Sequence, residues 1–262
     1  MRNRKIGIIL VLFIIILAVV GILVTRAFNS GNGSGDAPDW DGKGGKGNAA
    51  ETETVQPTET PPPEPTPTFT VAPEGYFEDA LIIGDSRTEG IRMCADIPGV
   101  TYFCSVGMGV TGAFYEAVSV ANYGTVTLDS LLGMKQFGKI YIMLGINDIG
   151  GDVDTLAQRF GTLLERIRAA QPDALIIIEA NLRVTSSYNS TYVTNERIDR
   201  FNELISHYAD NVTVFYLDVN PLFDDGTGRG LNPSISPDGL HVPGAQYVEW
   251  GNWIMNHAVV FQ

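Results

Sequence analysis

Short apolar runs alternate with longer stretches of mixed polarity from residue 80 onward. Five runs predict buried strands, at residues 80–83, 101–106, 140–144, 174–178 and 212–217. Residues 153–170 and 195–208 carry apolar positions three and four apart, which predicts amphipathic helices. Strands that alternate with helices form parallel sheets covered on both faces. The pattern therefore predicts an α/β domain over residues 76–262.

The start of the chain has a different pattern. Residues 6–24 are all apolar or glycine, and a helix of this length spans about 28 Å, close to the roughly 30 Å hydrocarbon core of a bilayer. Three basic residues precede this run and only Arg26 follows closely, which predicts a cytoplasmic N-terminus. A cleaved signal peptide is the alternative, but it would have a shorter run and a small-residue cleavage site. We expect residues 1–27 to form a cytoplasmic N-terminus and a single-pass membrane anchor, with the remaining chain extracytoplasmic.

Residues 28–75 connect the predicted anchor to the predicted domain. They are rich first in Gly, Asn, Asp and Lys, and then in Pro, Thr and Glu. Such a composition cannot bury enough apolar surface to order itself, so a disordered linker is expected. The Pro-rich residues 57–73 favour polyproline II and a semi-rigid spacer of roughly 50 Å, the alternative being a tether with no set length.

Charge and cysteine content exclude some functions. The chain has 17 Lys plus Arg against 30 Asp plus Glu, a net charge of −13, which argues against binding to nucleic acid. Cys94 and Cys104 are the only cysteines and lack metal-ligand spacing. They could form a disulfide in an oxidising exterior, although their apolar neighbours favour buried thiols. No H-E-x-x-H or paired-cysteine pattern is present, so the sequence implies no metal and no cofactor.

Two predicted strands are followed by polar residues that could take part in catalysis. Ser86 follows the first strand at the start of a predicted helix, where a backbone amide and the positive end of the helix point at one place. Asn147 follows the third strand and can donate a hydrogen bond to an oxyanion without titrating. The alternatives are that the residues around Ser86 only cap the helix and that Asn147 only forms a turn. In parallel sheets, sites form at the carboxyl ends of the strands.

An acid and a histidine lie close together near the C-terminus. Asp238 precedes His241 by three residues in a loop bounded by proline and glycine. This separation lets the carboxylate hold one imidazole nitrogen while the other nitrogen faces a nucleophile. His207, on a predicted helix, and His257, near the chain end, have no comparable setting, so surface or packing roles are expected for them.

These segments together resemble the SGNH or GDSL hydrolase family. The G-D-S block lies at residues 84–86, the G-x-N-D block at 145–148 and the D-x-x-H block at 238–241, all in the order of the family. The resemblance covers residues 76–262. It implies a three-layer α/β/α flavodoxin-like fold with a parallel sheet, which agrees with the alternation of strands and helices.

The resemblance also implies roles for the site residues. Ser86 would be the nucleophile, His241 the general base and then acid, and Asp238 the residue that orients His241. The oxyanion hole would use the Ser86 amide, the Asn147 side chain and a glycine amide, for which Gly107 fits best.

Two departures from the family pattern leave the substrate open. Residues 105–109 lack the asparagine usual in the second block, so Gly109 remains an alternative to Gly107. Arg87 replaces the leucine of the first block.

Two further patterns have competing interpretations. Residues 107–112 spell G-x-G-x-x-G after a strand, as in dinucleotide-binding turns, but no clear strand ends in an acid about twenty positions later. Tyr247, Trp250 and Trp253 have helical spacing, which favours core packing over a substrate platform.

The sequence therefore predicts a membrane-anchored extracytoplasmic serine esterase. Its expected substrate is an acyl ester, in particular an O-acetyl ester, of a cell-envelope or extracellular glycan, and its membrane contact is through residues 6–24. The alternatives are an acyltransferase, lipase or thioesterase with the same triad, because water competes with other acceptors at an acyl-enzyme. The alternative outside the enzymes is a noncatalytic module that binds the cell envelope.

Overall fold

Five parallel strands form the central sheet of the protein, which a computed structural model describes for residues 66–188 and 190–262. They are β2 (Ala80–Gly84), β3 (Thr101–Cys104), β6 (Lys139–Met143), β7 (Leu175–Glu179) and β8 (Val214–Leu217). Their order is β3-β2-β6-β7-β8, and all neighbours pair in parallel. This is the order of flavodoxin-like sheets. The predicted parallel sheet is confirmed.

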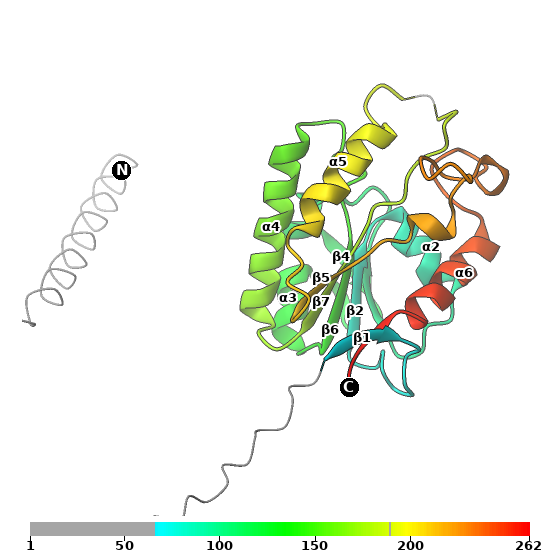
Figure 1. Cartoon of the computed structure of the whole chain (residues 1–262). Coiled ribbons are helices and arrows are strands. Elements are labelled where there is room, and N and C mark those ends of the chain that lie inside the picture. Colours follow the sequence, from blue (N-terminus) through cyan, green and yellow to red (C-terminus); the bar gives the residue numbers. More distant parts are fainter. Residues whose placement is uncertain (1–65, 189) are drawn as a thin grey trace, which may run out of the picture. The chain divides into compact units, whose positions relative to one another are not determined.

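Helices cover both faces of this sheet (Figure 1). One face carries α3 (Leu128–Met134), α4 (Val153–Ala170) and α5 (Asn195–Ser206), and the other carries α2 (Ser86–Cys94) and α6 (Gly244–Met255). The bounds of α4 agree with the prediction, whereas α5 ends two residues earlier than expected. The result is the predicted three-layer α/β/α arrangement.

The central strands explain why the core divides into two clusters. Every residue of β2 is buried, and successive side chains point to opposite faces. Leu81 and Ile83 pack under α4 and α5, while Ile82 packs under α6. A strand buried on both faces has a continuous apolar run, which is why these strands were predictable.

A strand that the sequence did not predict begins the described chain. β1 (Pro67–Thr70) pairs antiparallel with β9 (Ala258–Phe261), near the edge where the parallel strands begin (Figure 1). The Ala72 N–H also donates to Met255 O at the end of α6, at 2.8 Å. The expected linker end at residue 75 therefore lies inside the folded unit. The sequence of this strand is rich in proline and threonine and resembles the linker before it. Its partner strand is nearly two hundred residues away, so no local pattern indicates the pairing.

Smaller elements complete the unit. β4 (Ala117–Val120) and β5 (Gly124–Thr127) form an antiparallel pair, and short 3-10 helices occupy Gly112–Phe114, Asn220–Leu222 and Pro233–Ile235. No helix within residues 66–188 and 190–262 has the length and apolarity needed to cross a membrane. The predicted anchor at residues 6–24 and most of the predicted linker lie outside the described residues.

Candidate active site

Ser86 occupies the sharp turn between β2 and α2. It is half-buried and is the first residue of the helix, so its backbone N–H lies at the positive helix end. Asp85 caps the helix by accepting from the Arg87 N–H at 2.9 Å. A Cβ on Gly84 would lie 1.9 Å from Thr88 Oγ1, so only glycine fits this turn without a shift.

The strand order places this turn at the switch point of the sheet. From β2 the chain continues to β3 on one side, and the later strands are added on the other side, beginning with β6. Ligands of open α/β sheets bind in the crevice at such a point, outside the carboxyl ends of the strands. Ser86 begins α2 two residues after β2 ends and Asn147 lies in the turn after β6, so both predicted residues lie at this crevice.

A chain of hydrogen bonds joins Ser86 to the C-terminal loop. Ser86 Oγ lies 2.9 Å from His241 Nε2, and His241 Nδ1 lies 2.7 Å from Asp238 Oδ2. The structure thus brings Ser86 to a histidine 155 residues later in the chain, beside the nearby Asp238. Their order of contact, hydroxyl to imidazole to carboxylate, is that of a Ser-His-Asp triad.

The Asp238 carboxylate is held in place by its own loop. Its Oδ1 accepts from the backbone N–H groups of Leu240 at 2.9 Å and His241 at 2.7 Å. Desolvation raises the pKa of Asp238, but the His241 backbone N–H, the His241 ring and the Leu240 N–H outweigh it and lower the pKa to about 2. Asp238 is therefore ionised at neutral pH and can accept a hydrogen bond from the imidazole Nδ1–H.

Asn147 contacts the loop that follows β3. Its Nδ2 donates to Met108 O at 2.9 Å, and the neighbouring Asp148 Oδ2 accepts from Val110 N–H at 2.6 Å. Two predicted blocks, residues 105–109 and 145–148, are thereby fixed to each other. A primary amide has two N–H hydrogens, so Asn147 retains one donor beyond its bond to Met108.

The two glycines considered for the oxyanion hole differ in their surroundings. Gly107 has a φ of +83°, which L side chains rarely adopt, and a Cβ there would meet nothing within 4 Å. A Cβ on Gly109 would lie 2.3 Å from Asp148 Oδ2. Gly107 is therefore required by its backbone conformation, and Gly109 by the close approach of Asp148. The choice between their amides stays open.

A buried network of three asparagines supports the Asn147 loop, and the sequence analysis missed it. Asn181, which follows β7, accepts from Ile146 N–H at 3.1 Å and donates to Leu144 O at 3.0 Å. Asn202 and Asn220 in turn donate to Asn181 O at 2.8 and 3.2 Å. The available signal was the position of Asn181 after an apolar strand, the same signal that identified Asn147.

A polar cleft of about 450 Å³ adjoins Asp238. Most of its lining side chains carry a hydroxyl or carboxylate group: Thr185, Ser187, Tyr188, Ser236 and Asp238, with Pro233, Pro237 and Gly239 completing the wall. The cleft offers hydrogen-bonding groups beside the Ser86–His241–Asp238 chain.

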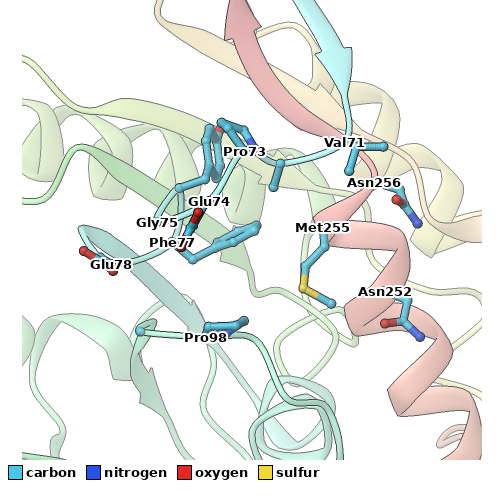
Figure 2. Close-up of a pocket in the computed structure, with 13 residues that line it drawn as sticks. Val71, Pro73, Glu74, Gly75, Phe77, Glu78, Pro98, Asn252, Met255 and Asn256 are labelled. Atoms are coloured by element: carbon cyan, nitrogen blue, oxygen red, sulfur yellow. The ribbon is translucent and has the colours of Figure 1, made fainter.

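Figure 2 shows a second cavity, of about 820 Å³, whose lining does not include Ser86, Asp238 or His241. Its walls are residues 71–78, the turn at Pro98 and Gly99, and the last turn of α6. Residues 71–78 precede β2, and Pro98 and Gly99 precede β3, so the cavity lies at the amino ends of these strands, whereas Ser86 follows the carboxyl end of β2. It therefore forms no part of the candidate active site.

The remaining sequence patterns have structural explanations. The segment after Gly107 continues into a 3-10 helix and the β4–β5 pair, so it lacks the long helix of a dinucleotide-binding turn. Tyr247 and Trp250 are buried, which confirms core packing for them, while Trp253 is half-buried and stacks on His257 at a centroid distance of 4.2 Å. His207 is exposed at the end of α5.

Only one of the cysteines is buried as expected. Cys104 is buried and donates to Glu89 Oε2 at 3.1 Å, but Cys94 is exposed, and both are free thiols. The expectation of burial was wrong for Cys94, which is exposed at the last position of α2, where the helix ends.

The chain belongs to the GDSL-like lipase/acylhydrolase family, whose sequence model matches residues 82–247. Members of this family are hydrolases of acyl esters, and esterase activity in general follows for this chain. No curated protein matches the chain in sequence.

Solved structures agree with the fold. A presumed platelet activating factor from Streptococcus pneumonia has a TM-score of 0.51 and 20% identity, over 68% of this chain and 81% of that chain. A presumed acylhydrolase from Bacteroides fragilis NCTC 9343 has a TM-score of 0.50 and 16% identity, over 72% of this chain and 92% of that one. At these identities the likeness supports the fold alone.

Proposed function

We propose that the chain is a serine esterase in which Ser86 is the nucleophile, His241 the general base and acid, and Asp238 the residue that orients His241. The observation that carries this proposal is the continuous hydrogen-bonded chain from Ser86 Oγ through both ring nitrogens of His241 to Asp238 Oδ2. A noncatalytic binding module has no need of this alignment.

The chemistry has two halves. His241 Nε2 takes the Ser86 hydroxyl proton while Oγ attacks the acyl carbonyl carbon, and the resulting imidazolium then gives that proton to the leaving alcohol. Water next attacks the acyl-enzyme, His241 accepts a water proton, and Ser86 Oγ leaves with it as the free hydroxyl. Asp238 stays ionised throughout and stabilises the imidazolium.

Negative charge on the carbonyl oxygen develops in both halves. The Ser86 N–H, the unused Nδ2 hydrogen of Asn147 and the N–H of Gly107 or Gly109 are the proposed donors. Their position supports this role, because the loops after β2, β3 and β6 leave three neighbouring strand ends.

The proposed substrate is an acyl ester, in particular an O-acetyl ester, of a cell-envelope or extracellular glycan. The polar cleft beside Asp238 supports a carbohydrate alcohol, because hydroxyl and carboxylate groups can pair with sugar hydroxyls.

Purified protein comprising residues 61–262 tests this function with esters of increasing acyl length, including acetylated oligosaccharides and a thioester. Residues 61–262 contain the whole compact unit to which β1 belongs. Turnover is expected to be highest for acetyl esters of glycans. Preference for long acyl chains would indicate a lipase, acyl transfer to an added alcohol would indicate a transferase, and no turnover of any substrate would contradict the proposal.

We also propose that residues 6–24 anchor this esterase with its catalytic unit outside the cytoplasm. β1 lies near the amino ends of the parallel strands and Ser86 at the carboxyl end of β2, so a tether attached before β1 would leave the active site free. In intact cells that produce the full chain, added protease is expected to reach the catalytic unit. Protection until the membrane is opened would contradict this orientation, and a soluble form that starts near Phe28 would indicate cleavage instead.

A further inference from the structure

The residue after the proposed nucleophile is a buried arginine. Arg87 exposes only 1% of its surface, although it lies in the first turn of α2. Its Nη2 donates to Leu240 O at 3.3 Å, and Leu240 directly precedes His241. One side chain thus connects the helix that begins with Ser86 to the loop that carries the imidazole.

That loop has no regular secondary structure to hold it. Residues 236–243 contain only bends and irregular backbone. Two hydrogen bonds from other segments hold consecutive carbonyls of the loop: Thr185 N–H donates to Gly239 O at 2.9 Å, and Arg87 donates to Leu240 O. The Arg87 bond is the one that comes from the helix of Ser86.

Burial of the Arg87 charge is energetically unfavourable. Burial raises the pKa of Asp85 and lowers the pKa of Arg87, and the attraction between these two charges offsets part of both effects. Within the described chain, Arg87 Nε, Arg87 Nη1 and Asp85 Oδ2 have no hydrogen-bond partner. A buried charge costs free energy unless it is paired and fully hydrogen-bonded. Core stability alone therefore does not explain an arginine at the position where the family pattern has leucine.

We propose that Arg87 is a positioning residue that fixes the loop of Asp238 and His241 relative to Ser86. The inference rests on the proposed triad. Arg87 acts through Leu240 O, since it is too deeply buried to touch a substrate, and its effect is on the alignment of His241 Nε2 with Ser86 Oγ.

The test compares Arg87→Met with Arg87→Lys and with Arg92→Met, which removes an exposed arginine from the same helix. Misplacement of a reacting group by about 1 Å can cost about 10²-fold in rate. Arg87→Met is expected to lower kcat by about this factor with little change in KM. Arg87→Lys should recover part of kcat, because an ammonium can still donate to the carbonyl but lacks the guanidinium fork. Arg92→Met should keep wild-type kcat.

Hydrogen exchange measures the positioning without using activity. The N–H groups of Leu240 and His241 donate to Asp238 Oδ1, so a loosened loop should exchange them faster. Arg87→Met should speed exchange of residues 238–241 and leave β6 unchanged. If this change occurs but the wild type cleaves no ester, the positioning role stands and the proposed function fails.

Arg87→Met alone leaves the buried Asp85 charge without its neighbouring positive charge and could fail to fold. The double variant Asp85→Asn with Arg87→Met removes both buried charges and controls for this effect. A folded double variant should keep the low kcat and the fast loop exchange. Wild-type kcat in folded Arg87→Met or in the double variant, or unchanged exchange of residues 238–241, would overturn the proposal.

Discussion

Asn147 has one amide hydrogen bonded to Met108 O and one left over, which makes it the residue where catalytic and structural roles can be separated most clearly. If the second hydrogen stabilises charge that appears only in the transition state, Asn147→Ala should lower kcat far more than it changes KM. Loss of one such donor costs about 10²- to 10³-fold. Asn147→Asp should be at least as harmful, because a carboxylate cannot donate and repels an oxyanion.

Melting temperature is measured beside kcat to separate a turn role from this one. If Asn147 only shapes a turn, Asn147→Asp should be tolerated, and any defect should appear as a lower melting temperature and not as a lower kcat. Both Asn147 variants lose the bond to Met108, so some loss of stability is expected in each. Asn252→Ala, on the exposed side of α6, serves as the matched control and should keep wild-type kcat and stability. If Asn147→Asp were fully active, Asn147 would not be an oxyanion donor.

Among individual residues, the sequence was sufficient to identify candidates that follow a strand or lie in a short D-x-x-H loop. Ser86, Asp238 and His241 could be named because strand ends and a three-residue spacing are local features. Asn181 also follows an apolar strand, but its role could not be predicted, because its partner Ile146 N is brought to it only by the folded chain. The same holds for Arg87 and its partner Leu240 O.

Among the elements, β7 ends with a buried acid beneath α6. Glu179 exposes 2% of its surface, and burial raises its pKa from 4.5 to about 7, an effect that the Trp250 indole reduces. The folded state therefore keeps a proton that the unfolded chain loses above about pH 4.5. The stabilisation from this proton is complete below that pH and is lost as pH rises to about 7.

Glu179→Gln tests this linkage, because glutamine is neutral at every pH. The variant should gain stability relative to wild type by on the order of 3 kcal/mol between pH 4.5 and pH 8. Denaturant unfolding at a series of pH values measures the difference, with Glu165→Gln on the exposed side of α4 as the control. A difference between Glu179→Gln and wild type that does not vary with pH would contradict a raised pKa.

The elements differed in how well the sequence predicted them. Strands β2, β6 and β7 are nearly continuous apolar runs, and α4 has a regular apolar face, so their positions were predicted to within about a residue or two. β1 was missed because its pairing with β9 closes a loop of almost the whole folded unit. β4, β5 and α3 are short, and their burial depends on neighbours far along the chain.

At the scale of the whole molecule, the strand order explains why the site is where it is. The switch between β2 and β6 opens a crevice at the carboxyl ends of the strands, and the loop before α6 brings His241 to that crevice. The sequence could predict the alternation of strands and helices but not this meeting of distant loops, which the family resemblance supplied.

The most direct measurement of the central claim is covalent labelling by a fluorophosphonate, followed by mass spectrometry to locate the modified residue. Wild-type protein should be labelled at Ser86, because a nucleophilic serine paired with a base reacts with such probes. Ser86→Ala should abolish both labelling and ester turnover, and His241→Ala should be nearly as damaging because triad members act as a unit. Ser130→Ala, at an exposed serine of α3, should behave as wild type. Labelling at another serine, or ester turnover that survives in Ser86→Ala, would contradict the account.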